Sequence, residues 1–148
     1  MDVIYILQSS LAPILLISAV GLLLLGLGNR TGRIIDRLRK FSDEVRRGEV
    51  SQERWDIIQM QKGTLIKRLK LCRNAMLYYY LTILFTSISS IMSFLQFFHH
   101  FFGYVAVLAL ALALGSLFIG AIFAVYEVLF TYTAVMKETD FYLNTENR

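Results

Sequence analysis

Residues 51–98 read SQERWDIIQMQKGTLIKRLKLCRNAMLYYYLTILFTSISSIMSFLQFF, and they predict one long helix with two chemically different halves. Residues 51–73 are charged and carry a heptad of larger side chains, whereas residues 74–98 are apolar and contain no charged residue. At a rise of 1.5 Å per residue, such a helix is roughly 70 Å long, more than twice the thickness of the hydrocarbon core of a bilayer. The stretch therefore predicts a helix that crosses a membrane and continues outside it.

The whole chain is too apolar for a soluble domain of its size. Hydrophobic residues make up 56% of the 148 residues, and proline occurs once. A globule this small has too much surface to enclose so many apolar side chains. Lipid must therefore solvate most of them, and the shortage of proline agrees with this, because irregular backbone is excluded from hydrocarbon.

Three apolar segments are long enough to span a membrane, namely residues 4–28, 75–98 and 103–127. The first has no basic residue before it, which favours a retained span over a cleaved signal peptide. Residues 30–73 contain thirteen Lys and Arg against six Asp and Glu, a bias typical of cytoplasmic segments. We therefore expect a single all-α membrane domain with its N-terminus outside. A helical hairpin of residues 29–74 and a short tail of residues 137–148 are expected in the cytoplasm.

The hairpin is predicted from two stripes of larger side chains at helical spacing. On the outgoing arm the stripe consists of Ile34, Leu38, Phe41 and Val45. On the return arm it consists of Trp55, Ile58, Lys62, Leu65, Leu69, Cys72 and Met76. Stripes at steps of three and four residues pack two helices against each other. Gly48 suits the end of the outgoing helix and Ser51 the start of the return helix, so the turn is expected between them.

Polar residues of the second span recur on one helical face, which we call the polar seam. Its members are Thr82, Thr86, Ser89, Ser93 and Gln96, and His100 continues the same spacing. A polar face is costly to expose to lipid, so the seam must contact protein or water. One interpretation is the wall of an ion pathway. The alternative is hydrogen bonding between helices or back to the same helix, which Ser and Thr commonly provide.

The third span carries a stripe of small residues that ends in an acid. The small residues are Ala109, Ala113, Ser116, Gly120 and Ala124. Such a stripe allows close approach of helices, and Glu127 is the next residue on the same face. Glu127 is expected near the inner membrane boundary, level with Arg30 and Arg33. It is either a structural ion-pair partner of one of these arginines, or a cation-binding carboxylate that lies with them at a pore mouth.

A basic face on the outgoing arm is a candidate surface for anionic lipid or a partner protein. It includes Arg37, Lys40 and Arg47, together with Arg33 nearer the membrane. The alternative is a solvated face that only sets topology. The sequence contains no phosphate-binding glycine loop, nucleophile elbow or zinc spacing, so we expect no enzyme activity, cofactor, metal site or nucleic-acid partner.

Two blocks of sequence resemble a known family. The apolar span followed by Asn29 and Arg30, and then by Arg33, Asp36, Arg37 and Arg39, resembles the start of the domain of unknown function 2721 family of small bacterial membrane proteins. Residues 65–81 and 126–128 resemble the family's second and third spans. The resemblance implies a three-span protein of the inner membrane, and it implies no activity.

The sequence leaves two hypotheses of function. The first is a homo-oligomeric ion channel of the bacterial inner membrane, because three helices enclose no solute pathway and any pore must lie between protomers. The polar seam would line it, and Glu127, Arg30 and Arg33 would lie near the inner mouth. The second is a non-conducting structural or regulatory module whose basic hairpin docks a cytoplasmic partner or anionic lipid. A channel requires a seam that faces a common axis, whereas the second hypothesis leaves it hydrogen-bonded within the protomer.

Overall fold

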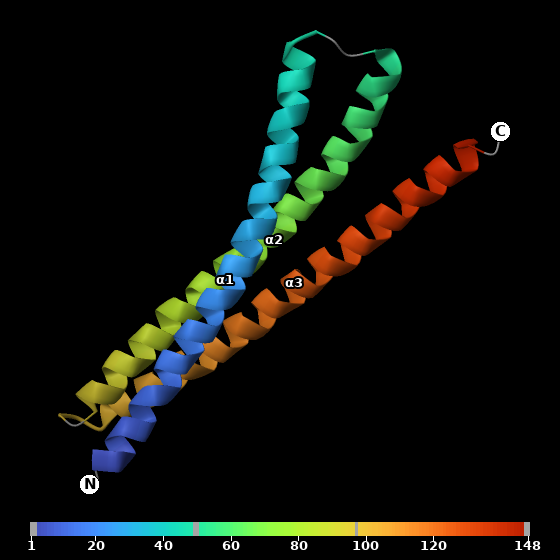
Figure 1. Ribbon diagram of the computed structural model, residues 1–148. Helices are drawn as coiled ribbons and strands as arrows, with labels where there is room; N and C mark the ends of the chain where they lie inside the picture. Colours follow the sequence, from blue (N-terminus) through green and yellow to red (C-terminus); the bar gives the residue numbers. More distant parts are fainter. Residues whose placement is uncertain (1–2, 49–50, 97, 147–148) are drawn as a thin grey trace. The chain divides into compact units, whose positions relative to one another are not determined.

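A computed structural model describes residues 3–48, 51–96 and 98–146 (Figure 1). Side-chain surroundings are described for residues 13–48, 51–52, 54–96, 98–133 and 136. Helix α1 runs from Val3 to Arg46, α2 from Gln52 to Leu95, and α3 from Phe101 to Glu146. Residues 49–50 of the expected turn, residue 97 of the expected second span and residues 147–148 of the expected tail lie outside the described residues.

The expectation of an all-α protein with one long second helix is confirmed. Helix α2 contains the charged half and most of the apolar half of the stretch quoted above without interruption, and it ends at Leu95, before the expected end at residue 98. Helix α1 passes through Pro13 within its first half. Helix α3 extends through the described part of the expected tail.

Within the part of the chain that the structure describes, three helices are long and apolar enough to cross a membrane. The segments with this property are Pro13–Arg46 in α1, Arg54–Leu95 in α2 and Phe101–Thr133 in α3. Large apolar side chains are exposed along them, as lipid-facing positions require, and they include Leu22, Leu25, Phe94, Val107 and Phe118. The length and composition of these helices indicate a membrane protein.

The internal contacts divide the chain into two units, which we name the apolar unit and the hairpin unit. The apolar unit comprises Met1–Leu27 and Ala75–Ala121. Its described core contains many small and medium side chains, among them Val20, Ala75, Ala106, Ala109 and Ala113, all at most 6% exposed. Three of these alanines lie on α3, so the small-residue face of that helix is the packed one, as its spacing predicts.

The hairpin unit comprises Gly28–Asn74 and Ile122–Arg148. The second half of α1 and the first half of α2 form the two arms, and their cores repeat at seven-residue steps: Ile34 and Phe41 on α1, and Ile58, Leu65 and Cys72 on α2. This spacing is that of a two-helix contact of coiled-coil type.

The turn between the arms has the expected end residues. Gly48 has a φ of 73°, a left-handed conformation that glycine adopts without steric cost, and its N–H donates to the Val45 carbonyl at 3.2 Å. At the start of α2, the Arg54 N–H donates to the Ser51 hydroxyl at 3.4 Å.

Candidate functional site

The N-terminal part of the polar seam lies between α2 and α3 in the apolar unit. Thr82 and Thr86 are fully buried, and Ser89 is 6% exposed. The Thr82 and Ser116 hydroxyl oxygens are 2.9 Å apart and share a hydrogen bond. The Ser89 hydroxyl donates to the Ala106 carbonyl at 2.8 Å. Two residues of the seam therefore join α2 to α3.

The remaining seam residues form no described hydrogen bond to α3. The Thr86 hydroxyl donates to the Thr82 carbonyl of its own helix at 2.7 Å. Ser93, near the C-terminal end of α2, and Gln96, just after it, are exposed. Among the described residues, every buried side-chain nitrogen or oxygen has a hydrogen-bond partner. The hydroxyls of the buried seam residues thus have hydrogen-bond partners within the chain, whereas Ser93 and Gln96 at the C-terminal end of the seam are exposed.

A close contact of α2 with α3 lies one turn from the seam. Tyr79 is 2% exposed, whereas its neighbour Tyr80 is exposed. A Cβ atom placed on Gly120 would lie 2.8 Å from Cε1 of the Tyr79 ring. With the ring in this position, a side chain at position 120 would overlap it, so Tyr79 packs against Gly120.

Glu127 is the centre of a polar cluster in the hairpin unit. Its side chain is 1% exposed. The Arg30 Nη1 atom donates to Glu127 Oε2 at 3.1 Å, and the Arg68 Nη2 and Nε atoms donate to Oε1 at 3.2 and 3.4 Å. The Thr131 hydroxyl lies 2.9 Å from the same Oε1 atom. One carboxylate of α3 therefore joins both arms of the hairpin, and its burial is compensated by two cations.

The cluster contains one arginine that the sequence pointed to and one that it did not. The spacing indicated Arg30 or Arg33 as the partner of Glu127, and the Arg30 pair is present. Arg33 is exposed and forms no described contact with Glu127. Arg68 was missed, because the stripe on α2 was identified from larger apolar residues. Pairing the two arms around the turn, which places residue 30 level with residue 68, would have found it.

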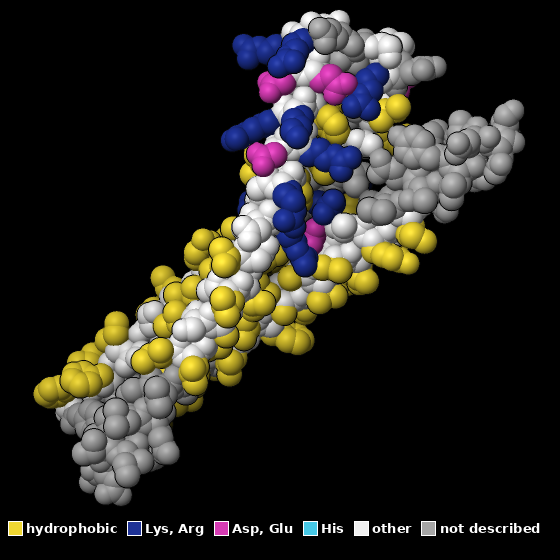
Figure 2. All heavy atoms as spheres, in the orientation of Figure 1, with side chains coloured by type: hydrophobic (Ala, Val, Ile, Leu, Met, Phe, Trp, Pro, Cys, Tyr) yellow, Lys and Arg dark blue, Asp and Glu magenta, His cyan; other side chains and the backbone are white. Residues whose placement is uncertain are grey.

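The hairpin arms carry the exposed charge of the described chain. Lys and Arg side chains gather over the second half of α1 and the adjoining part of α2, whereas the apolar unit presents hydrophobic side chains (Figure 2). The candidate docking residues Arg37, Lys40 and Arg47 are all exposed.

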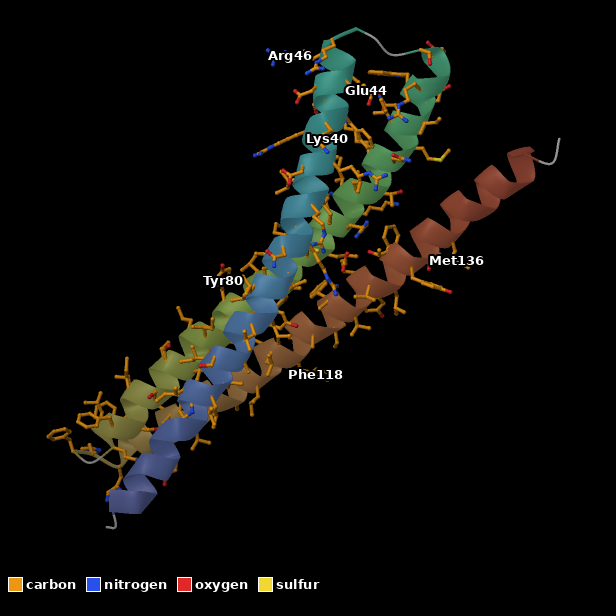
Figure 3. The ribbon with its side chains drawn as sticks, in the orientation of Figure 1. Lys40, Glu44, Arg46, Tyr80, Phe118 and Met136 are labelled. Carbon is orange, nitrogen blue, oxygen red and sulfur yellow. The ribbon has the colours of Figure 1, made fainter. Side chains whose placement is uncertain are left out.

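Near the turn, the two arms are joined by an ion pair. Glu44 lies toward α2 (Figure 3), and the Arg54 Nε atom donates to Glu44 Oε1 at 2.8 Å. Arg54 lowers the pKa of the Glu44 carboxyl through this hydrogen bond.

Other candidate chemistry is limited in the described residues. The described residues contain no group of three or more His, Cys, Asp or Glu side chains that could hold a metal ion. Cys72 is fully buried in the hairpin core as a free thiol. At the other end of α2, His99 accepts the Phe101 N–H on its Nδ1 atom at 3.3 Å and so satisfies a backbone donor at the start of α3.

Together, the three long apolar helices and the charged hairpin are those of an all-α membrane protein. The chain belongs to the family described as Protein of unknown function (DUF2721), whose model matches residues 10–137. No curated protein and no solved structure matches the chain.

Proposed function

We propose that the protein is a non-conducting structural or regulatory module of the membrane whose basic hairpin docks a negatively charged partner. The observation that carries the proposal is the hydrogen bond of Thr82 with Ser116. Hydroxyls that replace the water shell of an ion must face the ion's path. Those of Thr82, Thr86 and Ser89 are instead used within the protomer, which supports the packing interpretation of the seam.

The second element of the proposal is the hairpin. Arg33, Arg37, Lys40 and Arg47 are exposed on it, and among the described residues the buried acid Glu127 is paired with Arg30 and Arg68. A basic surface of this kind attracts acidic proteins and anionic membranes. In this proposal the protein lies in the bacterial inner membrane with the hairpin in the cytoplasm, and it forms a homo-oligomer.

A homo-oligomeric ion channel is the rival proposal. Ser90 and Ser93 on α2 and Gln96 just after it are exposed, and a wall between protomers could be built from these residues. In that case Glu127 and Arg30 would have to serve an inner mouth in addition to their mutual contact.

Reconstitution of the purified protein into planar bilayers tests the proposal, with the oligomeric mass measured on the same sample. We expect no unitary conductance, while a pore-forming peptide added afterwards gives the usual current steps. Reproducible conductance that changes in ion selectivity with Ser93→Asp would overturn the proposal in favour of the channel.

A further inference from the structure

The base of the hairpin, where its two arms adjoin the apolar spans, differs in charge from the rest of the hairpin. Residues 29–35 and 65–74 contain six Lys and Arg and no Asp or Glu. Residues 36–64 contain seven Lys and Arg and six Asp and Glu. The excess positive charge of the hairpin is therefore concentrated next to the membrane spans.

Five of the six basic residues at the base are exposed. We call them the basic collar: Arg30, Arg33, Lys67, Lys70 and Arg73. Arg30 remains 44% exposed even though it contacts Glu127. Glu127 itself is 1% exposed and engaged by Arg30 and Arg68, so it offers no accessible negative charge to the collar.

The collar faces more than one side of the hairpin. On α2, the helical spacing of Lys67 and Lys70 places them on the side opposite the buried residues Leu65 and Cys72. On α1, Arg33 lies one turn from Arg30, on the flank that contacts Glu127. Positive charge is thus presented on both flanks of the hairpin base.

This distribution favours a lipid over a protein as the anionic ligand. A protein partner contacts one face of a hairpin, whereas headgroups of a membrane surround its base from several sides. The collar also adjoins the apolar spans in sequence. Residues directly next to a membrane span lie at the level of the lipid phosphates. Farther out, acids alternate with bases, and Arg54 is engaged with Glu44.

We propose that the basic collar binds the phosphate groups of anionic phospholipids, with Arg33, Lys67 and Lys70 as its principal contacts. This inference rests on the proposed function and names the ligand of the hairpin. Arg30 contributes a guanidinium that is shared between Glu127 and the lipid surface.

A lipid titration of the full-length protein in neutral detergent tests the inference. Phosphatidylglycerol is added to one sample, phosphatidylcholine to a second and inorganic phosphate to a third, and thermal unfolding is followed in each. A ligand that binds only the folded protein raises the Tm, and we expect a rise of about 4 °C with phosphatidylglycerol. The rise should fall at high salt, because exposed charges are screened. Phosphatidylcholine and inorganic phosphate should leave the Tm unchanged.

Two triple variants with the same loss of charge separate the collar from the distal hairpin. The collar variant is Arg33→Gln with Lys67→Gln and Lys70→Gln, and the control is Arg39→Gln with Arg46→Gln and Lys62→Gln; all six positions are exposed. The collar variant should lose most of the phosphatidylglycerol response and the control should keep it. If the collar variant fails to fold, a second measurement replaces the comparison. Mass spectrometry then measures how much lipid co-purifies with the wild-type protein and with Lys70→Gln.

Several outcomes would overturn the inference. These are an equal loss of response in both triple variants, a rise with phosphatidylcholine as large as with phosphatidylglycerol, or a rise produced by inorganic phosphate alone. Where mass spectrometry replaces the comparison, the inference is overturned if Lys70→Gln co-purifies with as much phosphatidylglycerol as the wild-type protein. If phosphatidylglycerol has no effect and the bilayers remain silent, the lipid site is excluded while docking of an acidic protein still satisfies the proposed function. Conductance in the bilayer experiment excludes the proposed function itself.

Discussion

The carboxylate of Glu127 on α3 lies 3.1 Å from the guanidinium of Arg30 on α1, in a contact whose acidic partner is almost completely buried. Arg68 on α2 contacts the other carboxylate oxygen, so the hairpin unit has a polar centre to which all three helices contribute. Two cations beside one anion compensate the desolvation of the carboxylate. The cluster therefore joins the helices at a defined position along α3.

Removal of each charged member of this cluster should lower stability in a definite order. We expect a loss of about 2–4 kcal/mol for Glu127→Ala, about 1–3 for Arg68→Ala and about 1 for Arg30→Ala, because breaking a buried pair is costly and exposure reduces that cost. The side chain of Arg68 is 22% exposed and that of Arg30 is 44% exposed. Denaturant unfolding in detergent measures the order, with the exposed Arg39→Ala as the control. A loss for Arg30→Ala as large as for Arg68→Ala would contradict it.

A methyl group at position 120 should disturb the contact of α2 with α3. The Cβ atom of Gly120→Ala would lie 2.8 Å from the Tyr79 ring, and overpacking of this kind costs about 1–3 kcal/mol. Gly115→Ala is a matched control on the same helix, because a Cβ atom there has nothing within 4 Å. The control should be neutral or stabilise by up to about 1 kcal/mol through the helix preference of alanine. Equal thermal unfolding of both variants would show that Tyr79 moves aside freely.

Labelling with a water-soluble thiol reagent should separate the buried from the exposed positions. The native Cys72 is fully buried, so the wild-type protein should remain unlabelled until it is denatured. Thr86→Cys should behave in the same way, since Thr86 is fully buried. Met60→Cys, at a residue 77% exposed on the hairpin, provides the positive control. Labelling of Thr86→Cys in the folded protein in vesicles would show that the seam contacts water, and it would favour the channel proposal.

The ion pair near the turn should give the hairpin a modest dependence on acid. Arg54 lowers the pKa of Glu44, so the pair contributes stability above the carboxyl's ordinary pKa, and this is lost as the pH falls through the lowered value. Arg54→Gln should raise the pKa of Glu44 toward its ordinary range, whereas Arg46→Gln, another exposed position on the hairpin, should not. An NMR titration of the Glu44 carboxyl measures both. An unchanged titration in Arg54→Gln would show that the pair does not form in solution.

Much of the fold follows from periodicity alone. The heptad of α2 predicted which side of that helix packs, and Ile58, Leu65 and Cys72 are buried there, while Lys62, at one position of the same stripe, is exposed. The small residues of α3 predicted the face that is packed, and Glu127 at its end is buried as that spacing required. Both predictions succeeded because an apolar or small stripe must be covered wherever the rest of the helix is exposed.

Less of the candidate site could be predicted from the sequence. The spacing that aligned Thr82, Thr86 and Ser89 with Ser93 and Gln96 treated them as one surface, yet the first three are buried and the last two exposed. The first three residues are buried because α3 lies against that part of α2. The sequence of α2 alone does not show which part of the helix α3 covers. The burial of Tyr79 was likewise not predicted, because the space for its ring is created by Gly120, far away in the sequence.

The sequence by itself determined three long helices, the apolar lengths that suit a membrane, the turn at Gly48 and the burial of Glu127. These properties depend on local spacing, charge and length, which the order of residues contains directly. Only the tertiary structure decided that Arg68 joins Arg30 on Glu127, that Thr82 bonds to Ser116 and that Tyr79 covers Gly120. Each of these contacts depends on two quantities: how one helix is rotated about its axis, and how far it is shifted along that axis relative to a second helix. A periodic pattern leaves both quantities free, and the packing of side chains from two helices sets them.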